Sequence, residues 1–417
     1  MLAAPRLSAS YARYAHLSIG ARRLSTASFT EFEKAQWQKG ASSYKDTFAI
    51  VTEQAVNGLL DAAAVPRQTP AMRAMVMSVS PATIPGYNQA AVPAPAVAPP
   101  PVEELGGAAP AFKLLDVATG PGMLVKAAAE RGVSECVGID SSENFIAIAK
   151  PIADTHPGVA SFSVGDAEKL PFADGTFDAV TMGFLLLHLP SPEVALAEGF
   201  RVLKPGGKLS FSVWQDGAPG FTTVLNAIAA HGNADVPLPG APLPFFHFSD
   251  AGNAASALTA AGFDAASVNH EVVPCFAPLA DADDLFTMFA TATARTRALL
   301  EGQTPEALAA IRAAMSAEVA SKFGGTPTSM NPTDNSVPQR STSFTTAVPG
   351  TDALLHDGRP NGRVPYTVFM PCIVASATKP GGATAAKPKA AAKPKAEPKA
   401  KAEEKPAAKK KSKKAAA

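Results

Sequence analysis

The segment of the sequence that most constrains the fold is LLDVATGPGMLVKAAAERG, residues 114–132. A short apolar run ends at Asp116, a turn contains Gly120 and Gly122, and an alanine-rich stretch with helical character follows. Glycine is needed where a ligand lies against the backbone, because a Cβ would block it, and free amides at a helix start favour electronegative ligand atoms. The segment predicts a ligand held between a strand and a helix, and alone it fits NAD and FAD sites as well.

Apolar runs and helical stretches alternate from residue 111 to residue 214, a pattern typical of a parallel sheet with helices between its strands. The expected strands are Lys113–Val117, Glu135–Ile139, Ala160–Val164, Phe177–Met182 and Lys208–Trp214, and the expected helices cover about 121–131, 143–153 and 192–203. The LKPGG stretch, residues 203–207, is expected to be a tight turn before the fifth strand.

Two further features bear on which ligand the loop would hold. Asp140 ends the strand CVGID, where an acidic residue can accept both ribose hydroxyls of NAD or of S-adenosylmethionine. The glycine turn lacks a third glycine, because Val125 occupies the helix position where dinucleotide sites have one. The segments VGDAEKLPFADGTFDAV, FLLLHLP and EGFRVLKPGGKLSFSVW then follow in order between residues 164 and 214.

With these segments in this order, residues 111–214 resemble class I S-adenosylmethionine-dependent methyltransferases, specifically the ubiquinone/menaquinone-biosynthesis-methyltransferase-like (methyltransferase type 11) group. The resemblance extends weakly over 31–65, 215–323 and 364–379. It implies an α/β fold, with a Rossmann-like, seven-stranded, mostly parallel sheet and helices on both faces. The last two strands are expected near Ser267–Phe276 and Val364–Ala377, with helices of 281–323 inserted between them as a lid.

The resemblance also assigns cofactor roles by position. The first loop looks like the one that holds the methionine moiety, Asp140 like the ribose-binding acid, and Asp166 with Ala167 like the pair that reads adenine. Asp116 has the alternative role of organising the turn, and Asp178 is expected to close a loop without touching cofactor. The cofactor-binding residues expected in this way are Asp116, Ala118, Gly120, Gly122, Asp140, Ser141, Asp166 and Ala167.

Aromatic residues ahead of the first strand are the next candidates. Trp37 and Tyr44 are seven apart and share a helical face. In the family that the sequence resembles, a helix at this place closes over the cofactor, so Tyr44 is a candidate to cover the sulfonium with its ring. Ordinary packing of the helix on the core is the competing interpretation, favoured for Trp37 and equally weighted for Tyr44.

His188 is the candidate catalytic residue, since it lies just past the fourth strand, where a substrate would approach. It either removes a proton from an acceptor oxygen, nitrogen or carbon, or stabilises the loop. Methyl transfer from a sulfonium is an in-line displacement with a good leaving group, so alignment and dehydration alone are an alternative to a base. A second group is expected to shape the acceptor pocket, namely His231, His247, Phe245, Phe246 and Phe248.

The sequence divides into eight segments with distinct compositions. In chain order we expect a transit peptide at 1–30, a helical cap at 31–65, a Pro/Ala-rich insertion at 66–110, the S-adenosylmethionine-binding core at 111–280, the helical lid at 281–323, a polar loop at 324–362, the last strand at 363–379 and a disordered Lys/Ala/Pro-rich tail at 380–417. The first thirty residues contain four Arg and no acid. This composition is typical of a mitochondrial presequence, with a plastid one as the alternative and a plain basic terminus as the other interpretation.

Charge is distributed unevenly along the chain. Residues 379–417 carry a net charge of +10 and residues 1–30 carry +4, so the part between them carries −13 within a total of +1. An acidic body argues against nucleic acid as the substrate of the core. The tail itself is either a solvated extension or a weak, salt-dependent contact for nucleic acid.

The three cysteines and the apolar runs limit other classes of protein. Cys136, Cys275 and Cys372 are widely spaced and are interpreted as buried, reduced side chains, so we expect no metal site. No uninterrupted apolar run approaches the roughly 18–20 residues that a membrane span needs.

The sequence therefore predicts an enzyme that transfers a methyl group from S-adenosylmethionine to a small-molecule acceptor, whose reacting atom (O, N or C) stays open. Quinone methylation is not carried over, because further signature segments of the quinone-pathway enzymes are not found. The alternatives are a non-catalytic organellar scaffold or nucleic-acid-tethered factor that retains the fold, and an NAD-dependent oxidoreductase. Oligomeric state is left open.

Overall fold

The computed structural model describes residues 26–67, 111–324 and 365–381, with side chains from residue 29 onward. Its elements in chain order are α2 (Thr26–Asp46), α3 (Ala49–Thr52), η2 (Glu53–Ala55), α4 (Val56–Ala62), β1 (Lys113–Val117), α6 (Met123–Glu130), β2 (Glu135–Asp140), α7 (Glu143–Ala149), α8 (Pro151–Thr155), β3 (Ala160–Val164), β4 (Phe177–Gly183), η3 (Leu186–His188), α9 (Pro192–Val202), β5 (Leu203–Trp214), α10 (Pro219–His231), η4 (His247–Ser249), α11 (Ala251–Ala261), η5 (Ala265–Ser267), β6 (Asn269–Val273), β7 (Phe276–Leu279), α12 (Asp284–Ala292), α13 (Arg295–Glu301), α14 (Pro305–Lys322), β8 (Tyr366–Phe369) and β9 (Cys372–Thr378).

The centre of the fold is a seven-stranded sheet in the order β3-β2-β1-β4-β5-β9-β6. All neighbours from β3 to β5 pair in parallel, whereas β9 runs antiparallel to both β5 and β6. The predicted seven-stranded, mostly parallel sheet is confirmed. Strand order reverses between β1 and β4, and in open α/β sheets ligands bind at such a reversal, outside the carboxyl ends of the strands.

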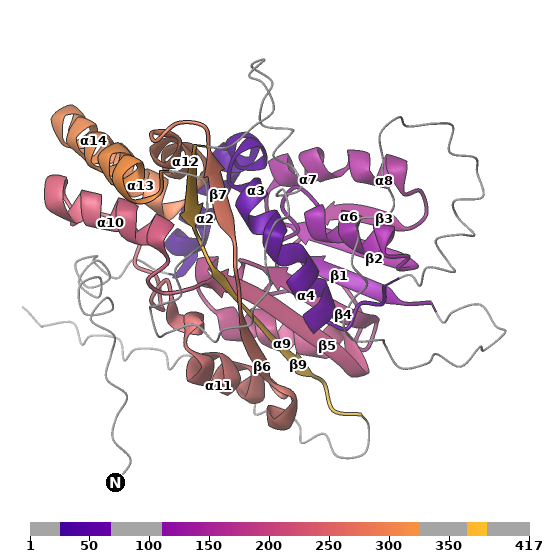
Figure 1. Ribbon diagram of the computed structural model, residues 1–417. Coiled ribbons are helices and arrows are strands. Elements are labelled where there is room, and N and C mark those ends of the chain that lie inside the picture. Colours follow the sequence, from indigo (N-terminus) through magenta and orange to yellow (C-terminus); the bar gives the residue numbers. More distant parts are fainter. Residues whose placement is uncertain (1–25, 68–110, 325–364, 382–417) are drawn as a thin grey trace, which may run out of the picture.

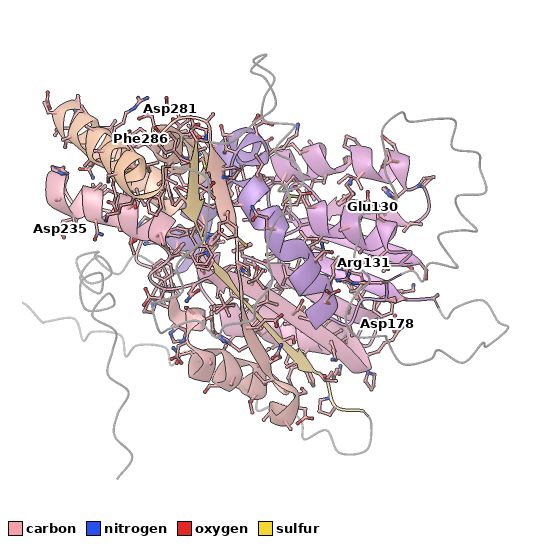
Figure 2. The ribbon with its side chains drawn as sticks, viewed as in Figure 1. Glu130, Arg131, Asp178, Asp235, Asp281 and Phe286 are labelled. Carbon is pink, nitrogen blue, oxygen red and sulfur yellow. The ribbon has the colours of Figure 1, made fainter. Side chains whose placement is uncertain are left out.

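Helices cover both faces of this sheet, as predicted (Figure 1). α4 packs with α6 over β4 and β5, while α11 packs with α9 on the opposite face. Arg131, just after α6, donates to Asp61 Oδ1 and Asn57 Oδ1 of α4, at 2.7 and 2.6 Å (Figure 2). These bonds hold the N-terminal segment on the sheet core even though some fifty residues of chain separate them from β1.

The LKPGG stretch is part of β5 and does not precede it, which corrects the prediction. Phe177 pairs with Leu203 and Ala179 pairs with Lys208, so residues 204–207 form an irregularity inside the strand. Gly206 adopts a left-handed φ of +83°, and its N–H donates to the carbonyl of Lys379 at 2.9 Å. Asp178 accepts from the Lys113 N–H and pairs with Lys204, so it joins the start of β1 to β4 and β5 and does not line the cavity.

The two C-terminal strand predictions each split in two. The segment 267–276 contains β6 and reaches the start of β7, and the segment 364–377 contains β8 and most of β9. A break at Met370 and Pro371 divides the second segment, since proline cannot donate to a strand ladder. β7 and β8 then form a separate two-stranded sheet, while β6 and β9 complete the large one.

The N-terminal cap and the lid form as helices. α2 begins at Thr26, so the expected presequence boundary at residue 30 falls within this helix. Phe29 is buried, and the Arg295 guanidinium lies 5.5 Å from its ring centre. The lid consists of α12, α13 and α14. Most of the Pro/Ala-rich insertion, the polar loop and the Lys-rich tail lies outside the described residues.

Two smaller predictions concern the cysteines and the membrane. All three cysteines are buried and form no disulfide, and the sulfur atoms of Cys275 and Cys372 are 3.7 Å apart. In the described ranges, every helix is too short or too polar to cross a bilayer.

Candidate methyl-donor and acceptor site

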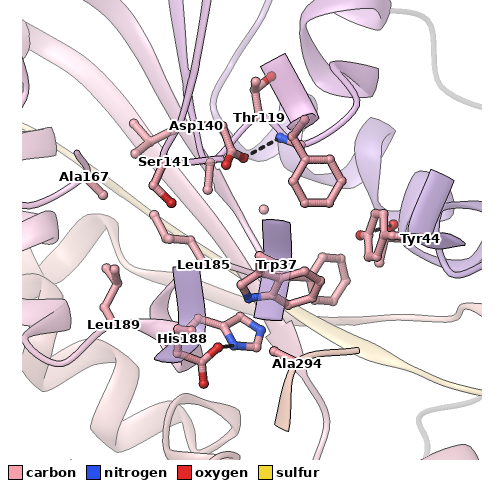
Figure 3. A pocket seen from close by; sticks show the side chains of 18 of the residues that line it. Trp37, Tyr44, Thr119, Asp140, Ser141, Ala167, Leu185, His188, Leu189 and Ala294 are labelled. Atoms are coloured by element: carbon pink, nitrogen blue, oxygen red, sulfur yellow. Dashed lines mark hydrogen bonds and ion pairs between the residues drawn. The ribbon is translucent and has the colours of Figure 1, made fainter. Parts of the chain in front are cut away.

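A cavity of about 200 Å³ lies at the carboxyl ends of the parallel strands, next to the reversal between β1 and β4. The segments that follow the strands line one side of it, at 117–121, 139–141, 165–167 and 183–185. Side chains of α2 and of the α12–α13 connection line the other side. Figure 3 shows Asp140, Ser141 and Ala167 facing Trp37, His188 and Ala294 across the space. We call these the strand side and the roof side.

The loop after β1 has three residues in the left-handed region. They are Ala118, Gly120 and Gly122, with φ values of +59°, +53° and +87°. A Cβ on Gly120 would meet nothing within 4 Å, whereas one on Gly122 would come within 2.7 Å of the Ile152 side chain. Ala118 and Gly120 line the cavity and Gly122 does not. Gly120 therefore leaves room for a ligand, while Gly122 is needed so that the loop packs against α8 and β3, which corrects its expected cofactor role.

Asp140 lies beside this loop and is 8% exposed. Its Oδ2 accepts from the Gly120 N–H at 2.9 Å and its Oδ1 from the Ser142 N–H at 2.8 Å. Burial raises the pKa of this carboxyl, while the backbone donors of Ser142, Gly120 and Ser141 act against that rise. Each oxygen keeps a lone pair, so the geometry leaves Asp140 able to accept two adjacent hydroxyls.

Asp116 is placed differently from the prediction. It is fully buried in β1, its Oδ1 accepts from the Thr181 hydroxyl at 2.7 Å, and it is not among the residues that line the cavity. Burial raises its pKa to about 7. The bond to Thr181 joins β1 to β4 below the loop, and Oδ2 has no hydrogen-bond partner among the described residues.

The two residues expected to read adenine, Asp166 and Ala167, line the cavity, and so does Ser141. Asp166 Oδ1 accepts from the Glu168 N–H at 2.9 Å, which shapes the turn after β3 and leaves the other carboxylate oxygen free of that bond. Gly165 precedes this turn, and a Cβ there would come within 3.2 Å of Ile139.

Both aromatic candidates of α2 reach the cavity. Trp37 makes edge contacts with Tyr44 and His188, at ring-centre separations of 5.8 and 4.9 Å (Figure 3). The Tyr44 hydroxyl lies 2.8 Å from Thr52 Oγ1, and burial raises the Tyr44 pKa to about 12. The Trp37 ring packs on the buried Phe145, as the packing interpretation held, and it also forms part of the cavity wall.

His188 lies on the roof side and has a partner that the sequence did not reveal. Its Nδ1 is 3.0 Å from Oε2 of Glu33, which belongs to α2 and whose side chain is 5% exposed. Arg295 at the start of α13 lies 3.8 Å from the other Glu33 oxygen, and burial lowers the pKa of this arginine. Glu33 and Arg295 both line the cavity. No local motif marks them, because they are 262 residues apart and only the fold joins them.

The expected acceptor wall is largely a packing cluster. Only Phe245 of that group lines the cavity. Phe246 packs on Phe221, Phe248 is buried against Phe211, and His247 contacts Asn253. His231 ends α10 outside the cavity. The aromatic residues that line the roof side and the end of β5 are Trp37, Phe48, Trp214, Phe221 and Phe245.

Polar bonds attach the roof to both halves of the fold. Gln38 accepts from the Ser142 hydroxyl at 2.6 Å, and its carbonyl accepts from Asn144 at 2.8 Å. Gln36 is held by the 2%-exposed Arg297, whose Nη2 lies 2.6 Å from the Gln36 Oε1. α2 is thereby fixed to the loop after β2 and to the lid at the same time.

A strained residue sits at the centre of the site. Phe184, directly after β4, has a left-handed φ of +52°, which is uncommon for a residue with a bulky side chain. Its N–H donates to the Ser212 carbonyl at 3.0 Å, and its ring lies 4.3 Å from that of Trp214. Such strain is found where a structure must present a group to a ligand.

These features fit S-adenosylmethionine and define a class of protein. Gly120 leaves open space in the loop after β1, the buried Asp140 can accept two adjacent hydroxyls, and Asp166 and Ala167 line the same cavity. With the strand order of the sheet, this arrangement defines a class I S-adenosylmethionine-dependent methyltransferase domain.

Comparison with known proteins places this domain in a family. Residues 115–211 match the family described as "Methyltransferase domain". The chain is 44% identical over 103 residues to the demethylmenaquinone methyltransferase of Renibacterium salmoninarum, covering 25% of this chain and 41% of that protein. It is 38% identical over 122 residues to the ubiquinone/menaquinone biosynthesis C-methyltransferase UbiE of Methylobacterium nodulans, covering 28% and 48%. Residues 115–211 are therefore similar to this group of methyltransferases.

These matches cover only part of each protein. The chain spans less than half the length of either curated relative. The family match of residues 115–211 excludes α2 and the α12–α13 connection, although it includes His188. Among solved structures, the YcgJ protein of Bacillus subtilis aligns at 18% identity over 65% of this chain and 93% of that one, with a TM-score of 0.36. The fold is therefore assigned from the strand order of the sheet and not from this alignment.

Proposed function

We propose that the protein transfers a methyl group from S-adenosylmethionine to a small-molecule acceptor. The site feature behind this proposal is the buried Asp140 carboxylate, bonded to the Gly120 amide across the carboxyl ends of β1 and β2, and the observation that carries the proposal is the family match of this region. S-adenosylmethionine supplies an activated methyl group on a sulfonium. The match of residues 115–211 to the methyltransferase family supports the same donor.

The chain's own residues supply binding, orientation and exclusion of water. Asp140 and the loop after β1 hold the donor on the strand side, while the ring of Tyr44 closes over it from α2. Aromatic faces attract positive charge, which suits a sulfonium. Because an in-line displacement needs its reactants aligned and dehydrated, a roof that shuts over the strand ends contributes to the rate. His188 faces the acceptor from the roof side.

The test is calorimetric titration of S-adenosylmethionine into the full chain and two variants. Asp140→Ala is expected to weaken binding tenfold or more, about 1.4 kcal/mol. The control Asp154→Ala replaces an exposed acid on α8 and is expected to leave binding unchanged. A folded wild-type protein that neither binds S-adenosylmethionine nor S-adenosylhomocysteine would exclude the proposal.

An NAD-dependent oxidoreductase is the function to exclude with the same protein. The acidic residue after β2 is common to both classes of site, whereas the family match favours the methyltransferase. Titration of NADH, read by its fluorescence, separates them. We expect no binding of NADH at concentrations at which S-adenosylmethionine saturates the protein.

We propose a mitochondrial destination, with a plastid one as the alternative, from the arginines and the lack of acid in residues 1–30. The start of α2 at Thr26 suggests a processing site before that residue, because cleavage after residue 30 would remove the buried Phe29. Import of the full chain into isolated mitochondria, followed by sequencing of the mature N-terminus, tests both points.

We also propose a weak, salt-dependent contact between the Lys-rich tail and nucleic acid, supported by its net charge of +10 over residues 379–417. Binding of a DNA duplex at low salt, lost on deletion of residues 382–417, is the expected result. Equal binding by the shortened chain would contradict it.

A further inference from the structure

The group that the proposed function leaves unexplained is the Glu33 carboxylate. It is 4% exposed, it lines the cavity, and its Oε1 has no hydrogen-bond partner among the described residues. A buried carboxylate oxygen without a hydrogen bond is unfavourable, and the Arg295 guanidinium at 3.8 Å is too far away to supply one. At the wall of a cavity, such an oxygen is placed to accept a hydrogen bond from a ligand.

The contacts of Glu33 divide between two roles. Its Oε2 lies 3.0 Å from His188 Nδ1, and its Oε1 lies 3.8 Å from the Arg295 guanidinium. A carboxylate accepts hydrogen bonds and does not donate, so His188 carries a proton on Nδ1. In a neutral imidazole the other ring nitrogen, Nε2, is then a proton acceptor.

We propose that Glu33 is the positioning residue that makes His188 a proton acceptor, and that the methyl acceptor is an aromatic hydroxyl. This inference rests on the proposed methyltransferase function. An amine attacks through a lone pair that it already has, whereas a hydroxyl becomes a strong nucleophile by losing its proton. A carboxylate-oriented imidazole is therefore matched to an O–H group.

The walls and charges fit the same acceptor. Trp37, Trp214, Phe221 and Phe245 surround the roof side with ring faces and edges, which favours a flat apolar body. Glu33 and Arg295 balance one another before the reaction. After proton transfer the imidazolium faces the Glu33 carboxylate, so the added positive charge is paired.

The proposed reaction moves one proton and one methyl group. The hydroxyl proton moves to His188 Nε2, the oxygen lone pair forms the O–CH3 bond, and the S–CH3 bond breaks with its electron pair remaining on sulfur. The products are a methyl ether, neutral S-adenosylhomocysteine and imidazolium, which returns its proton to water. The orphan Oε1 of Glu33 remains available for a second donor on the acceptor.

The first test is the tautomer of His188, measured by nitrogen NMR on the full chain with labelled histidine and assigned with His188→Gln. The expected wild-type ring carries hydrogen on Nδ1 and none on Nε2. Glu33→Met removes the carboxylate at similar length and is expected to move the proton toward Nε2, while Glu33→Gln keeps an oxygen acceptor and retains Nδ1–H. The control Glu31→Met changes an exposed acid of the same helix and is expected to have no effect. A wild-type ring protonated on Nε2 would overturn the proposal without any variant.

The second test uses 2-naphthol, 2-naphthylamine and 2-methoxynaphthalene as probes in the presence of S-adenosylhomocysteine. We expect 2-naphthol alone to shift the His188 Nε2 signal, by donating its hydroxyl proton. A shift with the amine and none with the naphthol, or with none of the three, overturns the assignment of an aromatic hydroxyl. Failure of the donor site is a separate outcome, because calorimetry with S-adenosylmethionine reads it without His188.

Discussion

The strand side and the roof side of the cavity are built in different ways. On the strand side, backbone amides and short loops follow consecutive strands, and the important side chain, Asp140, is fixed by its immediate neighbours. On the roof side, Glu33, His188 and Arg295 come from three distant parts of the chain. The family match of residues 115–211 includes the whole strand side but only His188 of those three.

This difference separates two properties of the enzyme. The family match of residues 115–211 covers the donor site made from these local loops. Glu33 and Arg295 of the roof side lie outside that region, and we propose that the roof side selects the molecule that is methylated. We therefore expect changes on the strand side to affect donor binding, and changes on the roof side to affect the acceptor and the stability of the closed form.

The largest change in stability and in donor binding is expected at the two glycines of the loop after β1. Gly120 faces the space for a ligand, whereas Gly122 packs against neighbouring side chains. Gly122→Ala adds a strained left-handed residue and a contact at 2.7 Å to Ile152, so it should cost about 2–5 kcal/mol of unfolding free energy. Gly120→Ala carries only the backbone strain, about 1–2 kcal/mol, but its methyl enters the cradle and should abolish S-adenosylmethionine binding. Urea denaturation and calorimetry measure both, and equal behaviour of the two variants would contradict the assignment.

Arg297 tests how the roof is attached. Arg297→Met removes the bonds to Gln36 and to the Thr291 carbonyl, and should cost about 2–3 kcal/mol because the arginine is buried. Faster hydrogen exchange in α2, with β1 to β4 unchanged, is the accompanying signature. Arg312→Met is the matched control, since its ion pair with Asp283 is exposed and worth about 1 kcal/mol or less.

Asp116 is expected to make the free energy of unfolding fall as pH rises. Its pKa is raised from 3.8 to about 7 in the folded state. Between these values the folded state holds more protons than the unfolded state, so this residue lowers the unfolding free energy as pH rises. Asp116→Asn cannot ionise, and its stability relative to wild type should improve between pH 4.5 and pH 8 by on the order of 3 kcal/mol. A parallel pH dependence of the two proteins would show that the carboxyl is not perturbed.

The smallest effect is expected at Tyr44. Tyr44→Phe loses the 2.8 Å bond to Thr52, which should cost about 0.5–1 kcal/mol. The ring remains, so S-adenosylmethionine affinity should change less than twofold in calorimetry. A tenfold loss would mean that the hydroxyl contacts the cofactor directly.

The sequence predicted the strand side well because its signals are local. Asp140, Ser141, Asp166 and Ala167 each follow a strand that an apolar run marks, and all of them line the cavity. The errors on this side, Asp116 and Gly122, arise because strand position does not tell which face of the loop a residue meets.

On the roof side, the sequence did not predict which residues line the cavity. Phe246, Phe248 and His247 neighbour Phe245 in the sequence, yet only Phe245 reaches the cavity, because η4 directs the rest toward the core and solvent. Glu33 looks like one more charge on a polar helix until α2 is packed against His188. The buried partner of an ionisable residue depends on tertiary contacts that no spacing encodes.

The central claim is that donor binding belongs to the strand side and acceptor chemistry to the roof side. Its most direct test is calorimetry of S-adenosylmethionine with Asp140→Ala and Glu33→Gln, measured side by side in the full chain. We predict a loss of tenfold or more for Asp140→Ala, about 1.4 kcal/mol, and a change below threefold for Glu33→Gln. Equal losses in the two variants, or no loss at Asp140, would contradict this division of the site.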